Sequence, residues 1–139
     1  MLTKLTFLLP IYEQMIEYGM KSLPSEACGI LSGKENKVRT IWPLQNELDS
    51  TKRFFVSEKA VLETLQQIDV KNEEVLAVYH THPLTKPTPS YYDMIYHSDE
   101  SVIMVIISYR TTQPLTRCFR IDKAHLRYEE CLFSIDPYY

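Results

Sequence analysis

The chain has 139 residues, of which 45% are hydrophobic and 24% are charged, and its formal net charge at pH 7 is −3. This length predicts a single domain over residues 1–139, because one hydrophobic core is normal for a chain of this size. The composition excludes a disordered or collagen-like chain. With 15 basic against 18 acidic residues, the charge gives no basis for nucleic-acid binding, so we expect no nucleic-acid partner.

The apolar runs are too short for a membrane-spanning helix. The longest, residues 102–107, is far below the roughly 20 residues that a span requires. Residues 1–10 lack the apolar stretch and cleavage site of a secretory signal. The three cysteines at 28, 118 and 131 have no ligand-like spacing, which favours buried thiols over a disulfide framework. We therefore expect a cytoplasmic protein without a membrane partner.

The first third of the chain predicts a helix followed by a β-hairpin. Apolar residues recur on one helical face over residues 10–23, and a proline follows them as a stop signal. Two apolar segments, 27–31 and 38–42, then enclose a polar stretch, a pattern typical of two strands joined by a turn.

A polar loop is expected over residues 46–52, followed by a short strand over 53–56. Ser57 is suited to cap a second helix, because its hydroxyl can accept a hydrogen bond from the first helical turn. The apolar face of this helix is expected to consist of Val61, Leu62, Leu65 and Ile68.

The second half predicts four strands, a stiff connector and a short helix. Residues 75–80 form an apolar run that becomes polar only at its end, as in a central strand buried on both faces. Three prolines within 83–89 exclude regular structure, and a short helix is expected from Ser90. The remaining strands are expected at 101–109, 115–121 and 126–133. Together these elements predict a layered α/β domain in which helices cover a sheet.

His80 and His82 lie at the polar end of the predicted central strand. Because side chains alternate along a strand, both imidazoles point to the same side. The start of the following helix can bring Asp93 back toward them. Two histidines and one carboxylate match the ligand set of catalytic zinc, which leaves one coordination position to water. The spacing thus predicts an open metal site formed by His80, His82 and Asp93.

Zinc lowers the pKa of a bound water from about 15.7 to about 7, which makes hydroxide available near neutral pH. A base must still move protons, and Glu26, just before the first hairpin strand, is the candidate. Spacing alone does not place Glu26 near the metal, because about fifty residues separate it from the histidines.

These residues belong to a longer pattern. Residues 26–31, 80–83 and 90–93 have the sequences EACGIL, HTHP and SYYD. The pattern resembles the JAMM motif of MPN-plus domain metalloproteases, with every motif position filled. The resemblance extends to Asn46 and to residues 53–56, and it covers about residues 10–109.

The resemblance implies a small, prokaryote-like zinc hydrolase with a layered α-β-α sandwich, a mixed sheet and the cytidine-deaminase-like MPN fold. It implies cleavage of a peptide or isopeptide bond, with a peptide, a ubiquitin-like protein or a sulfur-carrier protein as substrate. His80, His82 and Asp93 resemble the zinc ligands. Glu26 resembles the general acid/base, and Ser90 resembles the donor that stabilises the oxyanion.

Two of these assignments have an ordinary structural alternative. Ser90 and Asp93 nearly form a capping box, in which the serine caps the short helix and the acid favours its N-terminus. Both interpretations hold for Asp93 only if its carboxylate turns away from the backbone toward the ion. Glu26, taken alone, is typical of a solvated hairpin residue.

The remaining polar and aromatic residues have no assigned chemistry. His97 and His125 lack a partner pattern, and we expect them to be solvent-facing or structural. Cys28 is expected to be a small buried hydrophobe. The three tyrosines within 91–96 could line a substrate groove, but we expect at least one to pack against the helix.

Two functional alternatives remain open. The first is an inactive MPN-type scaffold that binds partners through its sheet edges and helices. Such relatives usually lack a metal ligand, whereas this chain lacks none. The second keeps the ligands and changes the ion, because two histidines and a carboxylate also suit non-haem Fe(II).

Overall fold

The computed structural model describes residues 4–137 of the chain. The helices are α1 (Leu9–Ser22), α2 (Glu58–Val70) and α3 (Tyr91–Ile95). The strands are β1 (Lys4–Leu8), β2 (Cys28–Lys34), β3 (Lys37–Leu44), β4 (Glu74–His82), β5 (Ile103–Ser108), β6 (Leu115–Asp122) and β7 (Arg127–Asp136).

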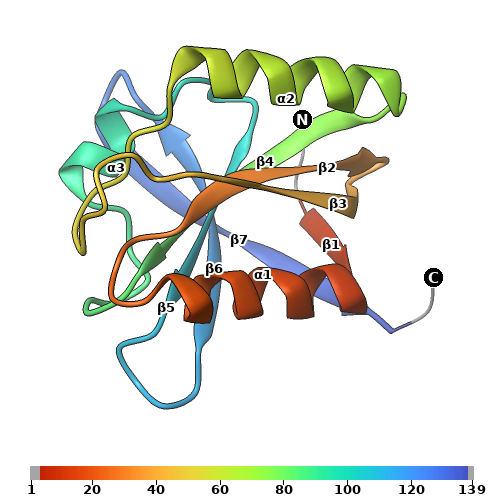
Figure 1. Ribbon diagram of the computed structural model, residues 1–139. Coiled ribbons are helices and arrows are strands. Elements are labelled where there is room, and N and C mark those ends of the chain that lie inside the picture. Colours follow the sequence, from red (N-terminus) through yellow and green to blue (C-terminus); the bar gives the residue numbers. More distant parts are fainter. Residues whose placement is uncertain (1–3, 138–139) are drawn as a thin grey trace.

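The strands form one mixed sheet that closes into a barrel in the order β1-β3-β2-β4-β5-β6-β7. β1 closes the ring, because it pairs in parallel with β3 on one side and with β7 on the other. Figure 1 shows α2 and α1 on opposite sides of the part of the sheet formed by β2, β3 and β4. The expected mixed α/β domain is confirmed. The expected sandwich is wrong, because the sheet closes on itself.

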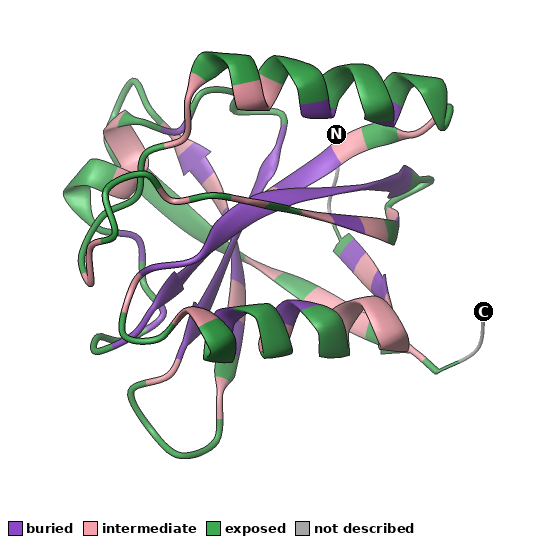
Figure 2. Cartoon of the chain, in the orientation of Figure 1, coloured by how far each residue is buried: buried purple, intermediate pink, exposed green. Residues whose placement is uncertain are grey.

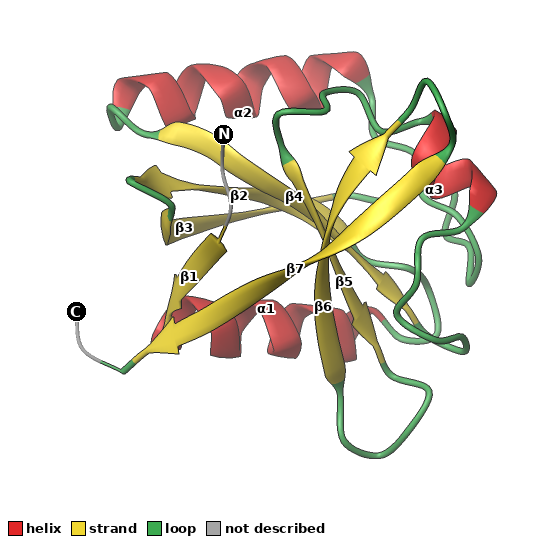
Figure 3. Cartoon of the chain, turned by 180° about the vertical axis from the view of Figure 1, so that it is seen from behind, coloured by secondary structure: helices red, strands yellow, loops and turns green. Residues whose placement is uncertain are grey.

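The closure depends on β1, a strand that we did not predict from the sequence. Leu5 and Phe7 alternate with more exposed residues, and both are buried in the core with Met15 of α1. The ring of Phe7 meets Phe133 of β7 edge-on, with the ring centroids 5.7 Å apart. Seen from behind, β7 passes next to β1 at this point (Figure 3). These contacts hold β1 in place and so close the barrel.

Most predicted elements are confirmed. The β2–β3 hairpin turns at Glu35 and Asn36, which both have the positive φ that a tight two-residue turn requires. Ser57 caps α2, since its side chain accepts a hydrogen bond from the backbone of Ala60. The connector over 83–89 has no regular structure. The predicted strand over 53–56 is wrong, because that segment is held by the Asn46 side chain and by one backbone hydrogen bond from Glu47 to Phe55, and it joins no strand of the sheet.

α2 buries a narrower face than predicted. Ile68 and the polar Thr64 are buried, but Leu62 and Leu65 are 51% and 37% exposed. Buried residues are concentrated instead along β2, β4 and β5 (Figure 2). None of the helices within residues 4–137 combines the length and apolar character needed to cross a membrane.

The pairing of β2 with β4 places the first part of the motif beside the second. The two strands are antiparallel, and their pairing continues to Ala27 and Thr81. The Thr81 N–H donates to the Ala27 carbonyl at 2.9 Å, and the Ala27 N–H donates to the Thr81 hydroxyl at 2.8 Å. Glu26 and His82 are the next residues on the two chains, and they are close enough for the charge of His82 to act on the Glu26 carboxyl group. Because opposed residues of antiparallel strands project to the same face, Glu26 is on the side of the two histidines.

We expect Thr81→Val to loosen this connection. Thr81 is fully buried, so the Ala27 N–H would lose its acceptor, which costs about 1–3 kcal/mol of unfolding free energy. Denaturant titration measures the loss, and NMR hydrogen exchange should show faster exchange of the Ala27 amide. Thr81→Ser keeps the hydroxyl and is the matched control. Equal protection of the Ala27 amide in both variants would contradict this role.

Candidate active site

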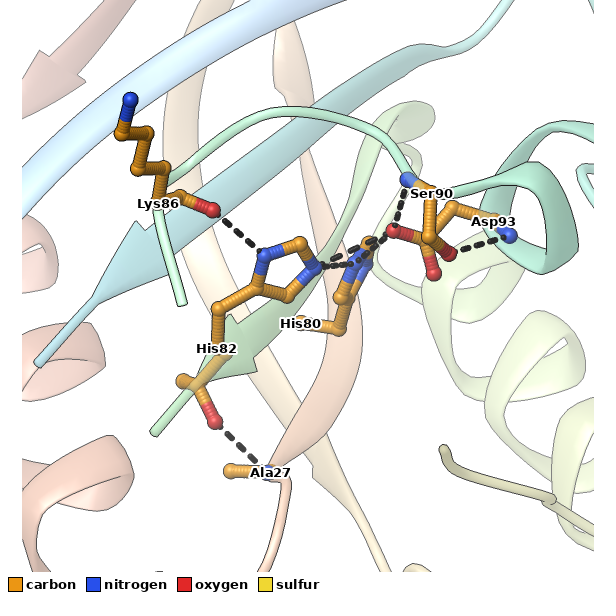
Figure 4. A network of polar contacts seen from close by, with 7 residues as sticks. Ala27, His80, His82, Lys86, Ser90 and Asp93 are labelled. Atoms are coloured by element: carbon orange, nitrogen blue, oxygen red, sulfur yellow. Dashed lines mark hydrogen bonds and ion pairs between the residues drawn. The ribbon is translucent and has the colours of Figure 1, made fainter. Parts of the chain in front are cut away.

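His80, His82 and Asp93 converge on one point (Figure 4). The Nε2 atoms of the two histidines are 3.1 Å apart, and each is 3.1 Å from Oδ2 of Asp93. All three side chains are at most 7% exposed. These residues form a group whose ligand atoms all lie within 4.8 Å of one another and could hold a metal ion. The structure thus brings together the three residues that the sequence pattern grouped.

A hydrogen bond to the backbone determines the tautomer of neutral His82. Nδ1 of His82 lies 2.8 Å from the carbonyl oxygen of Lys86. A carbonyl only accepts, so Nδ1 holds the proton and the Nε2 of the neutral ring has a lone pair. That lone pair faces the Asp93 carboxylate, which is also an acceptor. Two acceptors at this distance repel each other unless a proton or a cation lies between them.

The donor set fits a zinc ion. Ligand atoms at about 2.0–2.1 Å from a tetrahedral zinc lie about 3.3–3.4 Å from one another, close to the observed separations. Metal-binding histidines are commonly oriented by a hydrogen bond from the other ring nitrogen, which the Lys86 carbonyl provides for His82. The same donors also suit non-haem Fe(II), so the set fits either ion.

Asp93 both caps α3 and faces the histidines. The Asp93 N–H donates to Oγ of Ser90, and the Ser90 N–H donates to Oδ2 of Asp93 at 2.9 Å, which completes a capping box. The same Oδ2 contacts both histidines. The expectation that the carboxylate must turn away from the backbone is therefore wrong. Ser90 Oγ accepts one hydrogen bond in this box, and its O–H has no acceptor within residues 4–137.

Glu26 is buried, with only 2% of its surface exposed, so the interpretation of a solvated hairpin residue is wrong. Its N–H donates to the Ser50 carbonyl at 2.7 Å, which fixes its main chain. Its Oε1 atom has no hydrogen-bond partner among the described residues. Burial and the negative charge of Asp93 raise the pKa of Glu26 to about 8, although His82 opposes this. A carboxyl group that titrates near neutral pH is suited to general acid–base catalysis.

Asp93 and Glu26 are shifted in opposite directions. Burial raises the pKa of Asp93, but the charge and hydrogen bonds of the two histidines outweigh burial and hold the pKa far below its ordinary range. Burial lowers the pKa of His82, but its bonds to Asp93 and Lys86 outweigh that effect and raise the pKa. Near neutral pH one carboxyl group is therefore ionised and the other is largely protonated.

Asn46 organises the loop that adjoins Glu26. Its Nδ2 donates to the Glu26 carbonyl at 2.8 Å and to the Arg53 carbonyl at 3.0 Å. Its Oδ1 accepts from the backbone N–H groups of Leu48 and Phe55. One side chain thus replaces the neighbouring strand that residues 53–56 were expected to have. The sequence signal for this role is an asparagine in a polar loop, where its amide can replace backbone partners.

The same loop contacts the histidines and α3. The ring of Phe54 lies 5.1 Å from that of His80, and the Arg53 guanidinium lies 4.4 Å from the ring of Tyr92. The three tyrosines within 91–96 are 43–75% exposed. None of them is buried in the core, but the rings of Tyr92 and Tyr96 stack on each other along the helix, in line with the expectation that at least one tyrosine packs against it. Phe54 and Arg53 are site neighbours that sequence reasoning assigned to a strand.

The remaining histidines and cysteines lie outside the cluster. His97 is buried and donates to a backbone carbonyl at 2.9 Å, whereas His125 is exposed and pairs with Asp122, so one is structural and the other faces solvent, within the expectation for both. Cys28 is buried, and burial raises the pKa of its thiol to about 12. Cys131 is only partly buried, which corrects the expectation of three buried thiols.

The closed sheet and the His-His-Asp group define a mixed α/β domain with a candidate metal centre. A family model described as prokaryotic homologs of the JAB domain matches residues 9–122. The chain therefore belongs to this prokaryotic JAB family, and the motif-based assignment is confirmed. Desampylase from Pyrococcus furiosus is 32% identical over 83 residues. The match spans 60% of this chain and 59% of that protein.

Solved structures agree with this fold. The solution structure of a protein from Desulfitobacterium hafniense superposes with a TM-score of 0.85 at 26% sequence identity. The superposition covers 96% of this chain and 94% of the Desulfitobacterium chain. A JAB1/MPN domain protein from Archaeoglobus fulgidus gives a TM-score of 0.63 at 14% identity, and the superposition covers 96% of this chain and 99% of that protein. The similarity to the Archaeoglobus protein supports the fold alone.

We expect Zn²⁺ to stabilise the metal-free protein through this cluster. A ligand that binds only the folded state raises stability by about 2.7 kcal/mol at one hundred times its Kd. Thermal unfolding with and without added zinc measures the shift. Asp93→Asn should remove most of it, whereas Asp99→Asn, on the loop after α3, should retain it. An equal zinc-dependent shift in Asp93→Asn and the wild type would contradict the assignment.

The stability of the metal-free protein should reveal the raised pKa of Glu26. Glu26 is protonated in the folded state up to about pH 8 but ionises near its ordinary pKa of 4.5 when unfolded. The contribution of Glu26 to the free energy of unfolding is therefore fully present below about pH 4.5. It is lost as pH rises toward 8, by up to about 1.4 kcal/mol per pH unit. Glu26→Gln should gain stability relative to the wild type across this window. A difference between the two proteins that does not vary with pH would contradict the shift.

Proposed function

We propose that this protein is a zinc-dependent hydrolase that cleaves a peptide or isopeptide bond. The observation that supports this most directly is a buried, unpartnered Glu26 on the same side of the sheet as three convergent ligand atoms. Membership of the prokaryotic JAB family and the similarity to desampylase favour isopeptide hydrolysis.

In this proposal His80, His82 and Asp93 hold the ion. When bound there, zinc would polarise the scissile carbonyl and lower the pKa of water. The capping box keeps the Asp93 carboxylate in position, and the Lys86 carbonyl keeps His82 in the required tautomer. Both ligands are thus oriented before a metal arrives.

Glu26 and Ser90 supply the proton transfer and the hydrogen bond. Glu26, once ionised, accepts a proton from the attacking water and then delivers it to the leaving amine. The Ser90 O–H donates to the carbonyl oxygen as negative charge develops there. Its position suits this role, because Oγ is already oriented by the N–H of Asp93.

The proposed substrate is a ubiquitin-like or sulfur-carrier protein joined to its partner through its C-terminus, with a simple peptide as the alternative. The similarity to desampylase supports a protein conjugate over a free peptide. The cytoplasmic location and the single domain over residues 1–139 remain predictions.

An inactive scaffold explains the site less well. Burying a carboxyl oxygen without a hydrogen-bond partner is unfavourable, and so is directing the Nε2 lone pair of neutral His82 at the Asp93 carboxylate. A partner-binding module has no need for either feature, whereas a hydrolase uses both.

We expect Glu26→Gln and Glu26→Ala to abolish turnover while metal stays bound. Loss of a general base reduces kcat by about 10²–10⁴-fold. The assay is cleavage of ubiquitin-like fusion proteins, with zinc content measured by elemental analysis. Glu13→Gln, an exposed carboxyl change on α1, is the matched control and should match the wild type.

Two results would contradict the proposal. Unchanged turnover in Glu26→Gln would remove Glu26 from the mechanism. A wild-type protein that never retains a divalent ion after purification and reconstitution would favour the scaffold. Activity restored by Fe(II) but not by zinc would change the metal and keep the site.

A further inference from the structure

A groove of about 490 Å³ begins at the candidate site and follows the proline-rich connector. His82 and Ser90 are among the residues that line it, and Lys86 and Arg110 contribute its two basic side chains. No carboxylate belongs to its walls. The groove is therefore positive beside the reaction centre, although the whole chain has a net charge of −3.

Both cations lack a counterion within the described part of the chain. No ion pair within residues 4–137 includes Lys86 or Arg110, whereas Arg117 on the neighbouring β6 pairs with Glu130 at 2.7 Å. Both Lys86 and Arg110 are exposed. Their charges are thus available to a ligand rather than neutralised by the protein.

The backbone that carries these cations is fixed relative to the histidines. The Lys86 carbonyl accepts from His82, and the His82 carbonyl accepts from Tyr109 at 3.1 Å. The Ser108 hydroxyl donates to the Thr85 carbonyl at 2.5 Å and accepts from the Arg110 N–H at 3.2 Å. The proline-rich connector, the end of β5 and the end of β4 are therefore joined to one another by hydrogen bonds.

The side chain of Lys86 points away from the two histidines (Figure 4). An anion that contacts its ammonium would lie beside the cluster rather than on it. A guanidinium such as that of Arg110 can bind a carboxylate through two parallel hydrogen bonds. These features fit a carboxylate on a residue that flanks the scissile bond.

We propose that Lys86 and Arg110 bind a substrate carboxylate next to the scissile bond, so that the hydrolase prefers an acidic side chain or a free C-terminal carboxylate at that position. This inference rests on the proposed function, and it specifies that the substrate residue next to the scissile bond is negatively charged.

Quenched fluorogenic peptides test the preference. In one set, each position around the cleaved bond is Glu, Gln or Lys in turn, and in a second set the peptides end in a carboxylate or an amide. We expect the wild type to favour the carboxylate member of a pair by about tenfold in kcat/KM. The set in which the preference occurs identifies whether a side chain or a C-terminus is bound.

Variants of Lys86 and Arg110 test whether these residues cause the preference for a carboxylate. Lys86→Gln and Arg110→Gln should each reduce the carboxylate-to-neutral ratio, and the double variant should bring it close to one. Arg39→Gln is the matched control, because Arg39 is an exposed cation near the β2–β3 turn, at the opposite end of the β2–β4 ladder from His82. It should keep the wild-type ratio.

A binding measurement separates this inference from the proposed function. Fluorescence anisotropy with metal-loaded Glu26→Gln compares the same peptides without turnover. If the metal-loaded wild type cleaves none of them, the proposed function fails while the anisotropy ratio still decides the inference. The inference would be overturned if carboxylate and neutral peptides bound with equal affinity, or if none of the peptides bound. It would also be overturned if Arg39→Gln lowered the carboxylate-to-neutral ratio as much as the groove variants do.

Discussion

The site depends on the convergence of Nε2 of His80, Nε2 of His82 and Oδ2 of Asp93, which the fold holds 3.1 Å apart. Nε2 of the neutral His82 ring and Oδ2 of Asp93 are both acceptors, and a protein interior disfavours their contact unless a proton or a cation lies between them. Both groups are held from outside the cluster: the Lys86 carbonyl orients His82, and the α3 capping box orients Asp93. The fold therefore keeps together three side chains that could hold a cation.

The proposed hydrolysis also needs a proton acceptor whose pKa is close to neutral. The pairing of β2 with β4, which continues to Ala27 and Thr81, brings Glu26 near His82, although about fifty residues separate them in sequence. Burial alone disfavours the ionised form of Glu26, and the nearby negative Asp93 adds to this. Cation binding would oppose the effect of Asp93, so the two halves of the site are coupled through charge.

Local patterns in the sequence were sufficient for most elements and for the grouping of His80, His82 and Asp93. The alternation along residues 75–82 predicts that His80 and His82 share a face, and Ser57 and Ser90 cap the helices that follow them. Barrel closure was not predictable, because it depends on pairing β1 with both β3 and β7, which are distant in sequence. Residues 53–56 have strand-like composition, yet their backbone partners are the Asn46 amide and the N–H of Glu47 rather than a neighbouring strand. Burial of Glu26 likewise follows from long-range packing rather than from its neighbours in sequence.

Anomalous X-ray diffraction at the zinc absorption edge, from crystals of the protein reconstituted with one equivalent of zinc, tests the central claim most directly. We expect a single strong peak within bonding distance of Nε2 of His80, Nε2 of His82 and a carboxylate oxygen of Asp93. Stoichiometric zinc whose anomalous peak lies elsewhere, with these three side chains unliganded, would contradict the assignment.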